Sequence, residues 1–141
     1  MQLKALGNFF KTWYPAFVMM VIIFIMSSFP AVDSDRQSGL IINALTFLFP
    51  DLKNFSFLVT IVRKSAHFTE YMILGILTAR GFKISKKSPW WAILACAVYA
   101  GTDECHQSFV PGRSCEVNDV ALDTIGATFG VLIYWFFTRK K

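Results

Sequence analysis

Long apolar runs alternate with short polar segments along the chain, and this pattern predicts membrane-spanning helices. The first run, over about 12–32, contains no charged residue. At helical rise its roughly 21 residues reach about 30 Å, the thickness of a hydrocarbon core. Further spans are predicted over about 64–81, 89–109 and 118–138. The pattern therefore predicts an all-α integral membrane protein with four transmembrane helices.

The segment between the first two predicted spans follows a different pattern. The run from Gly39 to Pro50 is apolar but too short to cross a bilayer. Its length favours a short interfacial or re-entrant helix on the outer side. The second span is also short, since only about 15 positions, or about 22 Å, separate Lys64 from Arg80. Either Lys64 snorkels to the interface, or the outer end of this helix packs against protein.

Composition and charge support the membrane class. The 141 residues are 55% hydrophobic and 16% charged, whereas a soluble domain carries about 25% charged residues. The net charge of +5 does not indicate nucleic-acid binding, because no recognition-module pattern is present. Most basic residues instead lie in short clusters at the ends of apolar runs, as the positive-inside rule predicts for cytoplasmic loops. We expect a multi-pass protein of the plasma membrane, with a retained first helix and both termini in the cytoplasm.

Polar residues gather where the outer ends of the later spans meet. On the second, third and fourth spans they recur at spacings of three, four or seven residues, so each set shares one helix face. Neighbouring spans alternate in direction, which brings these faces to the same outer level. We predict one polar cavity there, covered by the 110–118 loop. The fourth span also carries Gly126 and Gly130, a small-xxx-small spacing that lets helices approach closely.

At these polar positions the chain resembles the VanZ-like family of small bacterial membrane proteins. The matching motifs are K-x-x-H-x-x-E-Y, from Lys64 to Tyr71, and D-E-x-H-Q-x-F-x-P-G-R, from Asp103 to Arg113, together with Asp119. The likeness extends from about Ser27 onward. It implies a bacterial cell-envelope protein, and the namesake of the family is associated with low-level resistance to the glycopeptide teicoplanin.

Three functional interpretations compete. In the first, the cavity binds a membrane amphiphile, either a lipid-linked cell-wall intermediate or a lipidated glycopeptide, and Lys64 and Arg113 meet its phosphate or carboxylate. The candidate ligand-binding residues are Lys64, His67, Glu70, Tyr71, Gln107, Arg113, Asp119 and Asp123. In the second, Asp103, Glu104 and His106 perform acid–base or metal-assisted catalysis on a lipid-linked envelope substrate. In the third, the protein is an accessory subunit whose charged loop docks a partner.

These residues also have purely structural interpretations. Asp103, Glu104 and His106 could join Lys64 and Arg113 in a cluster that holds the helices together. Arg113 could be the partner of Asp119 or Glu116.

The remaining candidate chemistry is limited. No HExxH motif or paired CxxC is present, so no metal ligand set is assigned, and the sequence leaves a cofactor unknown. Cys105 and Cys115 are both expected on the outer side, where they could form a disulfide.

Overall fold

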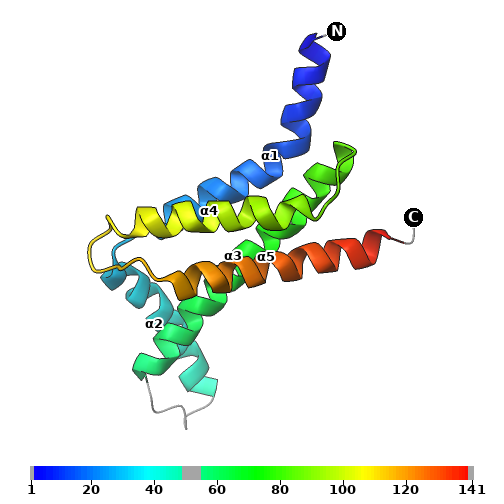
Figure 1. Cartoon of the computed structure of the whole chain (residues 1–141). Coiled ribbons are helices and arrows are strands. Elements are labelled where there is room, and N and C mark those ends of the chain that lie inside the picture. The colour runs from blue at the N-terminus through cyan, green and yellow to red at the C-terminus, as the bar shows by residue number, and fades with distance from the viewer. Residues whose placement is uncertain (1, 49–54, 140–141) are drawn as a thin grey trace.

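The computed structural model describes residues 2–48 and 55–139, and these form five α-helices (Figure 1). No strand occurs within those ranges. The all-helical fold predicted from the sequence is therefore confirmed. The helices are α1 (Gln2–Ser27), α2 (Ala31–Leu48), α3 (Phe55–Ile84), α4 (Trp91–Gln107) and α5 (Val117–Thr138).

Two of the four predicted spans meet the criteria of length and apolar composition for crossing a membrane. They are Phe9–Ser27 within α1 and Val117–Thr138, which is the whole of α5. Helix α4 has 17 residues, about 26 Å at helical rise, which is slightly short of a hydrocarbon core. Helix α3 has 30 residues and ample length, but Arg63, Lys64 and Glu70 interrupt its apolar sequence.

Helix α3 is the centre of the bundle and contacts each of the other helices, α5 most extensively. Small residues make this contact possible. A Cβ atom on Gly126 would lie 2.5 Å from the carbonyl oxygen of Phe68, and one on Gly130 would overlap the carbonyl oxygen of Met72. The spacing of these two glycines thus brings the backbones of α3 and α5 together, as the sequence predicted.

Helix α2 is longer than predicted and begins earlier. A short helix was expected from Gly39, but α2 starts at Ala31, immediately after Pro30. The carbonyl oxygen of Pro30 accepts hydrogen bonds from the backbone N–H groups of Asp33 and Ser34. Asp33 lies in the first helical turn, where a negative charge is favourable. The predicted end of this helix at Pro50 lies outside the described residues.

Helix α3 also begins earlier than the second predicted span. It starts at Phe55 rather than near Lys64, and it contacts both α2 and α5. Lys64 forms an ion pair with Asp119 at the start of α5. This end of α3 therefore contacts other helices of the protein, and Lys64 is held by an ion pair.

The surface is apolar over much of its area. Ile23, Tyr71 and Leu74 are buried in the core, whereas large side chains such as Phe10 and Phe137 are more than half exposed. Contiguous apolar surface of this kind marks contact with protein or membrane. Many of the exposed apolar residues lie along the two candidate spans, as expected of helices that contact lipid.

Candidate functional site

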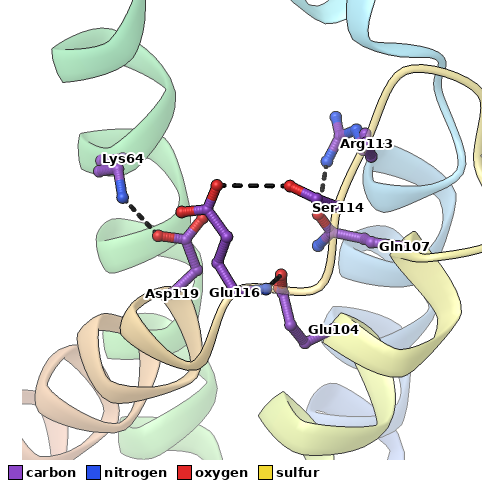
Figure 2. A network of polar contacts seen from close by, with 7 residues as sticks. All are labelled: Lys64, Glu104, Gln107, Arg113, Ser114, Glu116 and Asp119. Atoms are coloured by element: carbon purple, nitrogen blue, oxygen red, sulfur yellow. Dashed lines mark hydrogen bonds and ion pairs between the residues drawn. The ribbon is translucent and has the colours of Figure 1, made fainter.

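One end of the bundle collects the polar residues of several helices. The hydroxyl of Ser27, at the end of α1, donates a hydrogen bond of 2.8 Å to Asp103 on α4. The backbone N–H of Glu116, just before α5, donates one of 2.7 Å to Glu104. Figure 2 shows this contact together with the Lys64–Asp119 pair between α3 and α5. The second, third and fourth predicted spans therefore meet at one level.

The loop between α4 and α5 contains a tight turn that positions Arg113. Its backbone N–H donates to the carbonyl oxygen of Val110 at 3.1 Å, and Gly112 between them has φ +77°. Proline at the second position and a positive φ at the third are typical of a type II β-turn. The carbonyl oxygen of Pro111 accepts a hydrogen bond of 3.2 Å from the N–H of Ala31, which attaches the turn to the start of α2.

Arg113 is held by neutral partners. Its Nη1 donates to Gln107 Oε1 at 2.9 Å, and its Nη2 donates to the hydroxyl of Ser34. Its Nε is buried and has no hydrogen-bond partner among the described residues. Within residues 2–48 and 55–139 no carboxylate forms an ion pair with Arg113. The structural interpretation that paired it with Asp119 or Glu116 is therefore not what the structure shows.

Burial and a neighbouring cation make the position of Arg113 electrostatically unfavourable. Burial lowers the pKa of its guanidinium below the usual value and the charge of Arg63 lowers it further, whereas the charges of Asp103, Glu104 and Asp35 offset part of this effect. Arg63 forms a long ion pair with Asp35, with 4.0 Å between Arg63 Nη1 and Asp35 Oδ1. A bound anion at this position would relieve the repulsion between the two guanidinium groups.

Two small cavities that share lining residues lie among the described residues at this end of the bundle. The first, of about 150 Å³, lies between α1, α2, α3 and the loop, and Ser34, Gln37 and Glu70 are among its lining residues. The second, of about 50 Å³, lies under the loop, beside Gln107 and Asp119. The side chains common to both cavities are those of Arg63, His67 and Arg113.

Several predicted site residues lie outside these two cavities. Asp103 and Glu104 are each only 2% exposed and are hydrogen-bonded within the protein. The ring of His106 stacks on Phe24 of α1, with 4.4 Å between the ring centroids.

Tyr71 and Asp123 also lie outside the cavities and are buried between helices. Within the part of the chain that the structure describes, the Tyr71 hydroxyl and Oδ1 of Asp123 have no hydrogen-bond partner, and neither does Oδ1 of Asp103. These atoms are out of contact with solvent, and the charges of Asp103 and Asp123 act on Tyr71, so the three side chains form one buried polar layer.

Other lining residues were absent from the sequence prediction. Arg63 was overlooked beside Lys64, although it is Arg63 that lines the cavities. Ser34, Gln37 and Ser38 on α2 were overlooked because this segment was not expected to be helical. Their spacing of three and four residues would have indicated a common face had the helix been placed from Ala31 onward.

The hydrogen-bond donors at the site suit an anion better than a metal ion. Among the described residues, no group of three or more His, Cys, Asp and Glu side chains is arranged to hold a metal ion. The two arginines supply several fixed N–H donors, which match the oxygen atoms of a phosphate or carboxylate.

Comparison with known proteins identifies the family. No curated protein and no solved structure matches the chain. A sequence model of the VanZ/LLP1 family matches residues 12–138, which includes every residue of the polar site. The chain therefore belongs to the VanZ/LLP1 family, as its K-x-x-H-x-x-E-Y and D-E-x-H-Q-x-F-x-P-G-R motifs predicted.

Proposed function

We propose that this protein binds the anionic head of an envelope amphiphile at the outer leaflet of the plasma membrane. The ligand is a lipid-linked cell-wall intermediate or a lipidated glycopeptide, which share an acyl or prenyl chain and a phosphate or carboxylate. The observation that carries the proposal is the half-buried Arg113, whose partners are neutral and whose Nε donor is unused. Its charge is available to a ligand.

The charge and aromatic distribution supports four spans with both termini in the cytoplasm. Lys83 donates a hydrogen bond of 2.9 Å to the carbonyl oxygen of Thr138, and Arg139 lies 4.8 Å from the ring centroid of Trp135. Basic residues and tryptophans of this kind favour the cytoplasmic interface. Figure 1 shows the loop between α4 and α5 at the opposite end of the bundle from both termini. In this proposed orientation, the cavities lie at the level of the outer leaflet.

The cationic pair differs from the one expected from the sequence. Lys64 was expected to meet the ligand, but its charge is compensated by Asp119. Arg63 takes this role in our proposal, because it lines both cavities beside Arg113. A pair of guanidinium groups favours a doubly charged or bidentate anion such as a phosphate.

The environment of the acidic residues favours binding over catalysis. A general acid or base must reach the substrate, whereas Asp103 and Glu104 are buried and hydrogen-bonded to other parts of the protein. These contacts hold α1 and the start of α5 against α4. We assign both carboxylates the role of supporting the loop that carries Arg113.

The experiment compares resistance to two drugs in cells that express the protein. Teicoplanin carries an acyl chain and partitions to the outer leaflet, where the cavity would open, whereas vancomycin lacks this chain. We expect the wild type to raise the minimum inhibitory concentration of teicoplanin more than that of vancomycin. Arg113→Gln and Arg63→Gln should lose this effect, because glutamine keeps a polar group but removes the charge that binds the anion.

The matched control is Arg36→Gln. Arg36 is exposed on α2 and lines neither cavity, so this variant should protect as the wild type does at equal expression. Equal protection against both drugs, or full protection by Arg113→Gln, would refute the proposed function.

A further inference from the structure

The loop between α4 and α5 brings two cysteine side chains together. Cys105 lies in the last turn of α4, and Cys115 precedes α5. Their chain neighbours Glu104 and Glu116 are joined by the hydrogen bond of 2.7 Å already described. This bond attaches the segment before α5 to the last turns of α4, which brings Cys115 near Cys105, close enough for the Cys105 side chain to influence the Cys115 thiol.

Both thiols are accessible to reagents. Cys105 and Cys115 are free and exposed, whereas Cys96 is buried in the core. Thiol–disulfide exchange requires access of the attacking thiolate to a disulfide sulfur and a second thiol close enough to resolve the mixed disulfide. Cys105 and Cys115 meet both conditions.

We propose that Cys105 and Cys115 are a redox modification site that closes to an intramolecular disulfide. The oxidant is a disulfide of the outer compartment, either a small-molecule disulfide or a thiol–disulfide oxidoreductase. One thiolate attacks the oxidant, forms a mixed disulfide and releases one oxidant thiol. The second thiolate attacks the protein sulfur of that mixed disulfide and releases the other. The two cysteine thiols are oxidised, and one oxidant disulfide is reduced to two thiols.

The disulfide would close a ring that contains Arg113 and its β-turn. It would hold residues 105 and 115 together even when the Glu104–Glu116 hydrogen bond opens, so the loop could not lift from α4. The location of this chemistry in an oxidising compartment rests on the proposed orientation of the chain. The proximity of the two thiols does not depend on that orientation or on any ligand.

The test measures thiol accessibility in the full-length protein in isolated membranes. The membranes are first reduced, then treated with oxidised glutathione and exposed to maleimide before mass analysis of the intact chain. We expect Cys105 and Cys115 to lose maleimide labelling together, without retaining a glutathione adduct, and to regain it together after reduction. Cys96 serves as the internal buried thiol, labelled only after denaturation.

Single variants distinguish the disulfide from independent oxidation. In Cys105→Ser the remaining Cys115 has no partner, so it should retain glutathione as a mixed disulfide, and Cys115→Ser should behave in the same way. Separate glutathione adducts on both cysteines of the wild type would overturn the proposal. Persistent maleimide labelling of both after oxidation would do the same. Neither result would affect the drug-resistance experiment, so the two proposals can fail separately.

Discussion

Arg113 and Lys64 are cations at the same end of the bundle, but their partners differ. Lys64 is paired with a carboxylate, whereas Arg113 is oriented by a side-chain amide and a hydroxyl. An amide and a hydroxyl fix the direction of the guanidinium without neutralising it. This difference, rather than the presence of charge as such, is why we assign anion binding to Arg113.

Arginine geometry at position 113 is itself testable. Arg113→Lys retains the positive charge but loses the planar fork that reaches Gln107 and Ser34 together. We expect this variant to protect against teicoplanin less than the wild type, though more than Arg113→Gln, in the same inhibitory-concentration assay. Full protection by the lysine variant would show that charge alone is sufficient and that the fork is not needed.

Two tyrosines, Tyr71 buried and Tyr99 partly buried, allow the hydrogen-bond assignments to be tested by measuring stability. The Tyr99 hydroxyl donates a hydrogen bond of 2.7 Å to the carbonyl oxygen of Met20, whereas the Tyr71 hydroxyl has no partner in residues 2–48 and 55–139. We expect Tyr99→Phe to lower the free energy of unfolding by about 0.5–1.5 kcal/mol. Tyr71→Phe should leave it unchanged or raise it, because a buried unpaired hydroxyl is removed.

Reversible unfolding in mixed micelles measures both variants. If Tyr71→Phe lowered the free energy of unfolding as much as Tyr99→Phe does, the assignment of an unpaired hydroxyl to Tyr71 would be contradicted. It would indicate a partner in the buried layer that also contains Asp103 and Asp123.

At the scale of helices, hydropathy predicted α4 and α5 closely and α2 poorly. The spans at 89–109 and 118–138 are bounded by charged or turn residues that end the apolar runs. The polar first turns of α2 resemble a loop in hydropathy, although Pro30 and Asp33 are well suited to begin a helix. Helix α3 begins nine residues before Lys64, because Phe55 to Arg63 continue the helix although this stretch was not assigned to the apolar span.

Pairing between helices was the part of the candidate site that the sequence could not predict. Spacing showed that Asp119 and Asp123 share one face, and that Lys64 and His67 share another. It did not show that Lys64 meets Asp119 while Arg113 meets Gln107. Which side chains pair with each other depends on how each helix is rotated and on the turn at Gly112. Both are set only when the helices pack together.

The close contact of α3 and α5 predicts different effects of alanine at two helical glycines. A Cβ on Gly130 would overlap the backbone of Met72, whereas one on Gly101 of α4 meets nothing within 4 Å. We expect Gly130→Ala to destabilise the protein by about 1–3 kcal/mol, as overpacking does. Gly101→Ala should be neutral, or stabilising by up to about 1 kcal/mol through helix propensity. The same micelle assay applies, and equal stability of the two variants would contradict the observed packing.

At the scale of the whole molecule, the bundle has a basic, tryptophan-bearing end and an end that holds the polar cavities. This asymmetry supports the proposed orientation, and cysteine labelling tests it. In a background without Cys105 and Cys115, Ser114→Cys should react with a membrane-impermeant maleimide in intact cells. Ser85→Cys, in the loop between α3 and α4, should react only after permeabilisation. The reverse pattern would exclude an outer-leaflet cavity.

The central claim is that Arg113 binds an anionic amphiphile, and a direct binding measurement tests it best. The full-length protein in lipid nanodiscs would be titrated separately with a polyprenyl-diphosphate-linked cell-wall precursor and with teicoplanin, using the wild type, Arg113→Gln and Arg36→Gln. Loss of a charge-assisted contact of about 1.5–3 kcal/mol weakens binding by about tenfold or more. We predict saturable binding of at least one ligand, this weakening for Arg113→Gln, and wild-type affinity for Arg36→Gln. Binding of neither ligand, or equal affinity of all three proteins, would contradict the claim.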